Sequence, residues 1–368
     1  MMRPQIDFAT FADDAAIRKL LRREPMPGRI CVTFEREPNF WLGCEITGED
    51  CHVPVAREPE SGEIVGLACR STRKVFVNGD AQRLGYLGQL RVDSHFRGQW
   101  LVSRGFSKLK QLHDADPLPA YLVSIIDNNR EATGVLVRNW RPGFPNFHAV
   151  ADFRTLAILI HRGRRTHASD ISISSARADE LAELVAFLNL HGSERQFSKF
   201  WTAKEISGLF AFGLMLQDLR IARRAGQIVG VAGLWDQSAY KQTIVHGYSG
   251  WLKLVAPLYN LSAPWFGRSK LPSPGEKLKS AYASPFCIAD NDLHVCRALL
   301  DELLVLAETR GLRTLLIGFD CRDPLLAAVR GYRHIVYPSR IYLAEWSNGA
   351  SVHDQLDRRP INVDIATL

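Results

Sequence analysis

Long hydrophobic runs are missing from this 368-residue sequence. None approaches the ~18 consecutive apolar residues that a membrane-spanning helix requires, and the apolar stretch 155–160 is followed at once by His161 and Arg162. Residues 1–20 contain three aspartates and lack the apolar centre of a secretory signal. We therefore expect a cytoplasmic protein that does not enter a membrane.

Cysteine is scattered, and its spacing contains no C-x-x-C pair of the kind that serves zinc or redox sites. The seven cysteines are Cys31, Cys44, Cys51, Cys69, Cys287, Cys296 and Cys321. We expect most of them to be small buried residues and expect no metal site. The sequence also lacks the G-x-S-x-G motif and any obvious Cys–His arrangement, so it carries no signature of a nucleophilic serine or cysteine.

The composition is that of an ordinary globular protein, with 46% hydrophobic, 23% charged and 10% aromatic residues, which excludes disorder and fibrous structure. At roughly 150 residues per domain, the length suggests two domains, or three. Lysine and arginine number 46 against 39 aspartates and glutamates, a net charge of +7. This excess suits an anionic cofactor and a nucleic acid equally well.

The two halves of the sequence are similar to each other, which is the strongest guide to the architecture. An extended start, a turn and a helix-period segment occur at 6–17 and again at 171–182. A hairpin pattern at 55–66 is repeated at 221–230. An apolar strand that ends in an aspartate occurs in each half, with Asp127 matching Asp320.

This repeat predicts an α/β fold of two tandem domains, each with a mixed, partly antiparallel and partly parallel central sheet flanked by helices. The first domain spans 1–160, a polar basic linker 161–169 follows, and the second domain spans 170–346. The tail 347–368 is polar and is expected to be loosely ordered. Each half should end in a pair of strands. The proline-rich stretch 251–285 holds the extra residues of the second half and predicts a long loop or lid.

The most informative segment is 86–106, where a strand passes through a short polar loop into an amphipathic helix. Backbone N–H groups at a helix N-terminus have no partner within the helix and carry partial positive charge, so they bind phosphate without a specific side chain. Arg97 and Gly98 lie at this point.

The segment resembles the GNAT superfamily of N-acetyltransferases, whose signature is an apolar strand triplet followed by [QR]-x-x-G-x-[GA] at the start of a helix. The triplet here is Leu90-Arg91-Val92, and residues 97–102 (RGQWLV) occupy the signature. The hairpin at 64–66 and Asn129 with Ala132, an N-x-x-A pattern, are similar as well. The resemblance covers essentially the whole chain, once per half.

The resemblance implies acetyl transfer from acetyl-coenzyme A to a primary amine by direct attack, with no covalent enzyme intermediate and no metal. The triplet would pair with the pantetheine arm as an added strand, the amides of 98–102 would hold the pyrophosphate, and Asn129 would bond the thiol end. The implied cofactor-binding residues are Leu90, Arg91, Val92, Arg97, Gly98, Gln99, Trp100, Leu101, Val102 and Asn129. Val65 and Gly66 would lie along the acceptor side.

The sequence departs from the family pattern at three positions. Trp100 and Val102 stand where the family has small residues that let phosphate approach the backbone, and Leu136 stands where it has a tyrosine that protonates the thiolate. These departures support an alternative, a non-catalytic protein that binds coenzyme A or serves as a scaffold or sensor.

Two residues are candidates for acid–base or acceptor chemistry. Tyr86 lies on the same strand face as Leu90 and Val92, although a strand tyrosine is also a common packing residue. Asp127 either holds the acceptor amine or caps the next helix, and capping is the better supported role. His95 either binds phosphate or is solvated.

In the second half, the matching stretch 287–296 has no glycine and places aspartates where phosphate would approach. Such a helix start is a good cap, so we expect a degenerate second half and one working site. A basic tract could reach the 3′-phosphate of coenzyme A, bind nucleic acid or be a solvated surface. It consists of Arg138, Arg141, Arg154, Arg162, Arg164 and Arg165. Aromatic residues are not interleaved with these arginines, so nucleic-acid binding is not expected.

Several aromatic residues of the second half wall an acceptor pocket, line the interface between the halves or belong to the core. They are Tyr240, Tyr248, Trp251, Tyr259, Trp265 and Phe266. The sequence does not choose among amino acids, polyamines, antibiotics, peptide N-termini and protein lysines as the acceptor, because specificity depends on how loops pack.

Overall fold

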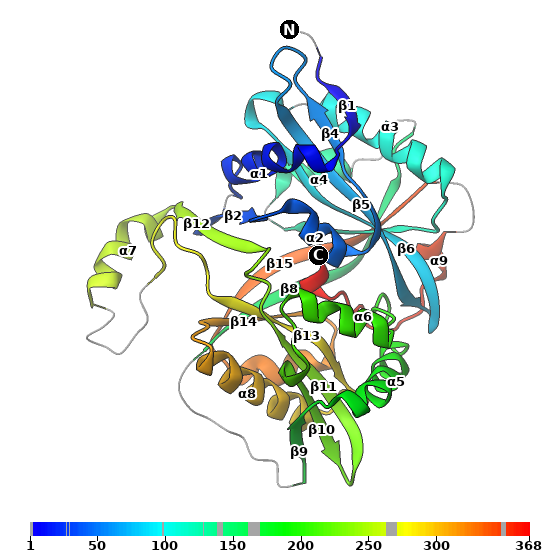
Figure 1. Ribbon diagram of the computed structural model, residues 1–368, viewed down its shortest axis with the longest axis vertical. Helices are drawn as coiled ribbons and strands as arrows, with labels where there is room; N and C mark the ends of the chain where they lie inside the picture. Colours follow the sequence, from blue (N-terminus) through cyan, green and yellow to red (C-terminus); the bar gives the residue numbers. More distant parts are fainter. Residues whose placement is uncertain are drawn as a thin grey trace.

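The computed structural model describes residues 3–26, 28, 30–97, 99–127, 129–137, 143–160, 170–262, 271–346 and 351–368. Within these residues, thirteen strands form one continuous mixed sheet, and two more strands pair separately (Figure 1). No helix in this part of the chain is long and apolar enough to cross a membrane. The linker expected at 161–169 lies outside the described residues.

The first half contains eight strands and four α-helices among its described residues. The strands are β1 (Gln5–Phe8), β2 (Ile30–Glu35), β3 (Glu49–His52), β4 (Pro54–Arg57), β5 (Ile64–Val77), β6 (Asp80–Val92), β7 (Tyr121–Ile126) and β8 (Asn146–Leu159). The helices are α1 (Asp14–Arg23), α2 (Phe40–Thr47), α3 (Gln99–Ala115) and α4 (Arg130–Leu136).

The second half continues with seven strands and five α-helices in the part that the structure describes. The strands are β9 (Ser172–Ser175), β10 (Leu219–Arg224), β11 (Gln227–Trp235), β12 (Gln242–Tyr248), β13 (Ser280–Ile288), β14 (Thr314–Asp320) and β15 (His334–Glu345). The helices are α5 (Leu181–Gly192), α6 (Ala203–Gly208), α7 (Trp251–Ser262), α8 (Leu293–Thr309) and α9 (Val352–Gln355).

The predicted local elements are present in both halves. β4 and β5 form the first expected hairpin, with Val55 opposite Leu67, and β10 and β11 form the second, with Ile221 opposite Val231. The apolar periodicity expected at 101–112 and 295–306 corresponds to α3 and α8, each of which buries one face against the sheet. Short-range patterning therefore identified these elements correctly.

The last strand of each half pairs with strands of the other half. The sheet order runs β7-β15-β8-β14, so β15 lies between β7 and β8, and β8 pairs with β14. The expected pair of final strands in each half is therefore wrong, since each half supplies one long strand. Both strands bury side chains on both faces of the sheet: Phe153 and Leu343 lie in one apolar cluster, and Phe147 and Tyr342 lie in another. The exchange joins the halves into a single sheet.

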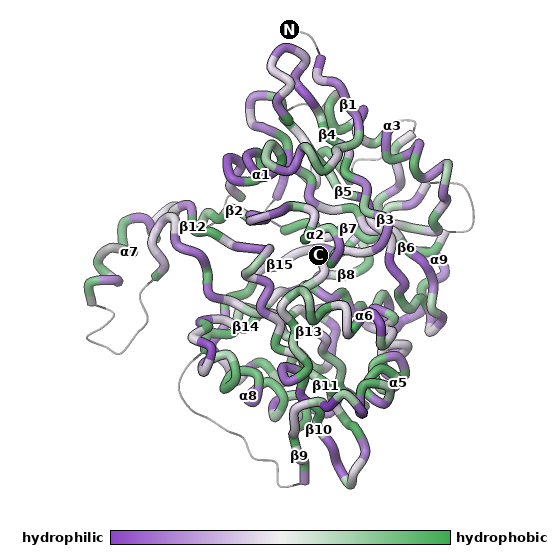
Figure 2. The backbone as a smooth tube through the Cα atoms, viewed as in Figure 1, coloured by the Kyte–Doolittle hydropathy of each residue, from purple (hydrophilic) through white to green (hydrophobic). Residues whose placement is uncertain are grey.

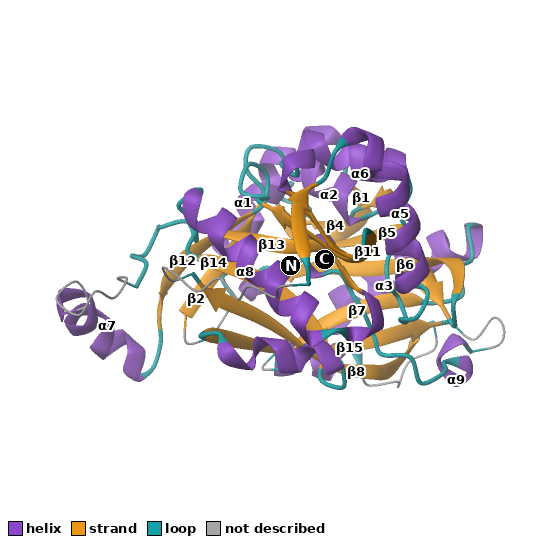
Figure 3. Cartoon of the chain, turned by 90° about the horizontal axis from the view of Figure 1, so that it is seen from below, coloured by secondary structure: helices purple, strands orange, loops and turns teal. Residues whose placement is uncertain are grey.

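Helices cover both faces of this sheet. α1, α2, α5 and α6 lie on one side of the strands (Figure 3), where they pack into two apolar clusters. α3 and α4 pack on the opposite face of the first half with Leu87 and Val123, and α8 packs on that face in the second half. Because residues alternate between faces along a strand, Tyr86 lies on the face opposite to its neighbour Leu87.

The C-terminal segment 351–368 is packed into the core, so the expectation of a loosely ordered tail is wrong for these residues. Ile361, Val363 and Ile365 are buried in the same cluster as Leu122 and Phe153. Main-chain bonds join Asn362 N to Gln196 O (2.8 Å) and Gln196 N to Pro360 O (3.0 Å). The alternation of apolar residues at 361, 363 and 365 is a strand-like signal that the polar composition of the tail concealed.

The stretch 251–285 is not the long loop expected from its prolines, because it starts with α7 and ends in β13. α7 extends away from the rest of the chain and carries several hydrophobic residues (Figure 2). Its side chains include the exposed Trp251, Leu254, Leu258 and Leu261. Residues 263–270, and with them Trp265 and Phe266, lie outside the described part.

Candidate active site

Two parallel strands of the first half diverge where the cofactor site was expected. β6 and β7 pair only at Gly85 with Tyr121 and at Tyr86 with Leu122. β6 remains paired with β5 on its other side as far as Val92. The edge of β6 that faces β7 is therefore unpaired beyond residue 86, and its backbone groups are available to a ligand.

A β-bulge interrupts β6 at this opening. Cys69 lies opposite Gly88, and Leu67 lies opposite Arg91, so β6 has one more residue than β5 between these pairs. Gln89 adopts a positive φ of 56° in the bulge. Its buried Oε1 atom lacks a hydrogen-bond partner within the described structure. Bulges of this kind redirect side chains and free backbone groups, and sequence patterning did not reveal this one.

The opening leads into a cavity of about 1680 Å³ that brings most of the predicted residues together. Ligand pockets for small molecules usually measure ~300–1,000 Å³, so this cavity is large. The predicted residues that line it are Tyr86, Leu90, Arg91, Val92, Leu101, Val102 and Asn129, with Gly66 and Leu136. It continues into the second half, where Lys241, Tyr259 and Tyr282 contribute to its wall.

The first turns of α3 border the cavity. The helix starts at Gln99, so the amides of its first turn have no partner within the helix, and Leu101 and Val102 line the cavity one step further. Free amides at a helix start are able to bind a phosphate. Gly98 and the side chains of Gln99 and Trp100 lie outside the described residues.

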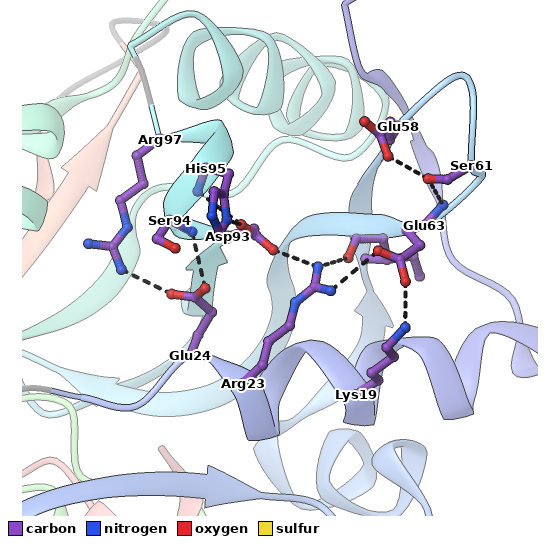
Figure 4. Close-up of polar contacts among 11 residues, drawn as sticks. Lys19, Arg23, Glu24, Glu58, Ser61, Glu63, Asp93, Ser94, His95 and Arg97 are labelled. Atoms are coloured by element: carbon purple, nitrogen blue, oxygen red, sulfur yellow. Dashed lines mark hydrogen bonds and ion pairs between the residues drawn. The ribbon is translucent and has the colours of Figure 1, made fainter.

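Ion pairs surround the loop that precedes α3 (Figure 4). Arg97 pairs with Glu24, which follows α1, and with Glu131 of α4, each at 3.0 Å. Glu24 also accepts a hydrogen bond from Ser94 N at 3.0 Å. Arg97 is 47% exposed. A phosphate bound by Arg97 would compete with these two carboxylates.

Asp93 organises the same loop. Its carboxylate accepts a hydrogen bond from His95 N at 2.9 Å and pairs with Arg23 at 2.7 Å. Burial alone raises the pKa of Asp93, but the hydrogen bonds from His95 and the charge of Arg23 outweigh this and lower it. The His95 ring also contacts Asp93 Oδ1 at 3.0 Å, so His95 supports the loop.

Tyr86 is only 5% exposed and lies inside the cavity wall. The Arg73 guanidinium lies 4.5 Å from the centre of its ring. Burial raises the pKa of Tyr86, and the charge of Arg73 opposes part of this rise. The phenol is thus protonated at neutral pH and can donate a hydrogen bond into the cavity.

Asp127 does not take the capping role expected of it, and Asn129 takes that role instead. Asn129, not Asp127, caps α4, because its Oδ1 accepts a hydrogen bond from Ala132 N at 2.9 Å. Capping by Asp127 is therefore wrong. Asp127 is exposed and is not part of the described cavity wall, so the structure does not bring it together with Tyr86. Asn129 lines the cavity while it caps the helix.

The corresponding opening of the second half is filled. β13 and β14 also diverge after a short parallel pairing, from Ser280–Thr314 to Tyr282–Leu316. The tail occupies the gap beyond, where Asp364 accepts a hydrogen bond from Ser284 Oγ at 2.6 Å, and only about 50 Å³ remains. Burial raises the pKa of Asp364 despite the Ser284 hydrogen bond.

The aspartate-rich start of α8 is a helix cap, as the sequence predicted. Asp292 accepts hydrogen bonds from His294 N (2.8 Å) and Val295 N (3.2 Å) and pairs with Arg224 at 2.9 Å. The basic tract is described only at Arg154 of β8. The other five arginines of the tract lie outside the described residues.

Comparison with solved structures identifies the fold. N-myristoyltransferase of Saccharomyces cerevisiae, solved with bound myristoyl-CoA, has a TM-score of 0.60 over 99% of this chain and 86% of its own, at 9% identity. A GCN5-related N-acetyltransferase of Sphaerobacter thermophilus has a TM-score of 0.54 over 93% of this chain and 96% of its own, at 13% identity. At such identities the likeness shows the fold alone.

A third solved structure contains a GCN5-related glucosamine N-acetyltransferase region within a fungal multi-domain GH3 β-N-acetylglucosaminidase. Its TM-score is 0.59 at 14% identity over 93% of this chain, which spans 38% of that protein's length. No family model and no curated protein matches the sequence. The chain thus has the mixed α/β fold of GCN5-related acyltransferases, and its structural neighbours are N-acyltransferases.

Proposed function

We propose that this protein is an acyl-coenzyme A-dependent N-acyltransferase with one working site, located in the first half, and that the transferred group is acetyl. The observation that carries the proposal is the contrast between the two strand openings. The opening between β6 and β7 leads into a cavity of about 1680 Å³, whereas the opening between β13 and β14 is closed by Asp364 and its neighbours.

In the proposed reaction, the acceptor amine attacks the thioester carbonyl directly, so the protein supplies alignment and hydrogen bonds. The free edge of Leu90 and Val92 holds the pantetheine arm, and the first-turn amides of α3 hold the diphosphate. Main-chain N–H groups freed by the bulge at Gln89 face the thioester carbonyl. Tyr86, protonated and buried, donates a proton to the departing thiolate.

The two halves are proposed to be tandem copies of one fold, with the second kept for packing. β9, α5, the β10–β11 hairpin, β13, α8 and β14 follow the order of β1, α1, the β4–β5 hairpin, β6, α3 and β7. We place the halves at 1–160 and 170–346. The tail then stabilises the second copy by filling the space that a cofactor would need.

The test is calorimetric titration with coenzyme A, acetyl-coenzyme A and a longer acyl-coenzyme A, followed by thiol release over a panel of amines. We expect micromolar-range binding of all three and release with at least one amine. Tyr86→Phe should lower kcat by ~10²-fold or more and leave cofactor affinity unchanged. Failure of the protein to bind any coenzyme A thioester would reject the proposal.

A non-catalytic coenzyme A-binding protein is the second candidate. It is favoured by Leu136, which puts an apolar side chain at the cavity wall, and by the engagement of Arg97 with Glu24 and Glu131. Cofactor binding without thiol release for any amine would support it. Tyr86→Phe would then change neither binding nor background hydrolysis.

A further inference from the structure

Two arginines form a positively charged patch inside the cavity. Arg36 follows β2, and Arg91 lies on β6, and both line the cavity. Arg36 is 5% exposed. It lies against α2 so closely that a Cβ atom added at Gly43 would be 2.8 Å from Arg36 Nε. Only a glycine leaves room for the guanidinium at this place.

Neither guanidinium contacts a carboxylate among the described residues. Arg36 donates to the carbonyl oxygen of Glu35 at 3.3 Å. Arg91 donates to the carbonyl oxygen of Leu90 at 2.8 Å and to the sulfur of Met26 at 3.4 Å. The nearby Glu24 is already bonded to Ser94 and Arg97. Burying a charge without an opposite partner costs free energy, and an anion bound at this patch would offset that cost.

The charges of the two arginines repel each other. Burial lowers the pKa of Arg36. Burial and the charge of Arg36 lower the pKa of Arg91 to about 10. An anion between the two would relieve both the desolvation and the repulsion. Two other cations are already hydrogen-bonded to the tail. Lys241 donates to the carbonyl oxygen of Leu368 at 3.0 Å, and Arg73 donates to that of Thr367 at 3.0 Å.

The patch is separate from the diphosphate site. α3, whose first turn would bind the diphosphate, packs on the sheet face of Leu87. Arg36 lies against α2, on the opposite face, which is also the face of Tyr86. The coenzyme therefore reaches the bulge from one face and leaves Arg36 and Arg91 beside the space for the second substrate.

We propose that Arg36 and Arg91 bind an anionic group of the acceptor, so that the substrate is an amine that also carries a carboxylate or a phosphate. This inference rests on the proposed function and specifies its acceptor. The bidentate geometry of guanidinium suits both kinds of anion. Polyamines and other purely cationic acceptors would be repelled from this part of the cavity.

The first test measures anion binding without catalysis. Acetate and inorganic phosphate are titrated at constant ionic strength into protein saturated with coenzyme A, and into free protein, while the thermal midpoint is followed. We expect stabilisation of the wild type that is absent in Arg36→Met and Arg91→Met. Lys204→Met, which removes an exposed charge from α6, should behave as wild type. Equal stabilisation of all variants would overturn the inference.

The second test compares matched amines in the thiol-release assay, 4-aminobutanoate with butylamine and O-phosphoethanolamine with ethanolamine. We expect the anionic member of at least one pair to have a kcat/KM higher by on the order of tenfold or more, and Arg36→Met to remove that preference. The pair in which the anionic member is preferred shows whether the acceptor carries a carboxylate or a phosphate. Turnover without preference in either pair would refute the anionic acceptor and leave the acyltransferase intact, whereas failure to bind coenzyme A would refute the acyltransferase itself.

The stability of Arg36→Met also shows whether Arg36 has a structural role. Methionine keeps the apolar stem and removes a buried charge that has no opposite partner, so the apo variant should be at least as stable as wild type. A loss of anion binding accompanied by a large fall in thermal midpoint would point to a structural role instead and contradict the proposal.

A second observation concerns a cluster of three cysteines in the first half. Cys44 of α2, Cys51 of β3 and Cys69 of β5 place their sulfur atoms within 4.8 Å of one another. Cys44 and Cys69 are buried, and Cys51 is partly exposed. Hydrogen bonds from Cys44 and Cys69 lower the pKa of Cys51, whereas the hydrogen bond with Cys51 raises the pKa of Cys44, and hydrogen bonds with both neighbours raise the pKa of Cys69. The three sulfur atoms are close enough for all of them to bind one ion.

We propose that Cys44, Cys51 and Cys69 bind a soft metal ion of the Cu(I) or Zn²⁺ class. Thiolates select such ions over Mg²⁺ and Ca²⁺. A zinc site usually has four ligands, so three thiolates favour Cu(I), or Zn²⁺ with an external fourth ligand. The expectation of no metal site rested on C-x-x-C spacing, which these residues, spread over three elements, do not show.

The metal proposal is tested on the full chain purified under reducing conditions and titrated with Cu(I) or Zn²⁺ alone, with bound metal measured by mass spectrometry. We expect one ion per chain and a raised thermal midpoint. Cys51→Ser should lose the ion, and Cys321→Ser, a cysteine of the second half, should keep it. Failure of the reduced wild type to retain either ion after desalting, or retention by Cys51→Ser, would overturn the proposal.

Discussion

Val102→Glu should weaken coenzyme A binding by on the order of a hundredfold or more, because like charges placed together at a binding surface cost several kcal/mol. Val102 lines the cavity in the first turns of α3, beside the amides proposed to hold the diphosphate. A carboxylate there would face the phosphates at short range. Calorimetry with coenzyme A measures the effect.

Folding of the Val102→Glu variant should be preserved, because an acidic residue near a helix N-terminus is favourable to the helix. Val102→Gln, which has the same length without the charge, separates repulsion from crowding. Ser107→Glu makes the same charge change at an exposed position of α3 and should bind as wild type. If Val102→Glu binds coenzyme A normally, the diphosphate does not lie at the start of α3.

The sequence predicted the part of the site that is formed by residues close together in the chain. The segment from Leu90 to Val102 combines a strand, a turn and a helix within a short stretch, and all three follow from residue periodicity. The cavity formed where this segment was expected to bind the cofactor. The apolar Leu136 likewise lies in its wall, at the position that the resemblance indicated.

Features that depend on distant pairing could not be predicted in the same way. β15 inserts between β7 and β8, and nothing in the local pattern of β15 specifies which strand it should pair with. Arg36 looks like an exposed residue at the end of a strand, and its burial depends on contact with Gly43 of α2. The acceptor side of the site is therefore visible only in the folded chain.

The two openings of the sheet also could not be distinguished by their strands, since both begin with short parallel pairings. Their difference arises from the tail, which lies far away in sequence. Ile365 lines the large cavity and the small one and thus separates them. Gly318 of β14 has no side chain where Ile365 packs, and a Cβ atom there would be 2.6 Å from Ile365 Cγ2.

Ile365→Ala should lower the free energy of unfolding by about 2–5 kcal/mol, the range found for buried isoleucine truncations. The side chain is 9% exposed and belongs to the apolar cluster that contains Phe153 and Val363. Its truncation removes packing and opens the wall between the two cavities. Chemical denaturation measures the loss, and an unchanged denaturant slope would show that the unfolded state is not altered.

Ile365→Leu conserves volume and should cost less than about 1.5 kcal/mol, and Leu190→Ala at an exposed site of α5 should have little effect. A loss below about 0.5 kcal/mol in Ile365→Ala, the level of ordinary surface changes, would mean that the tail does not fill the second opening in solution. That opening would then be free for a ligand, and the proposal of a single working site would lose its main support. The stability of one buried isoleucine thus decides how many cofactor sites the sheet provides.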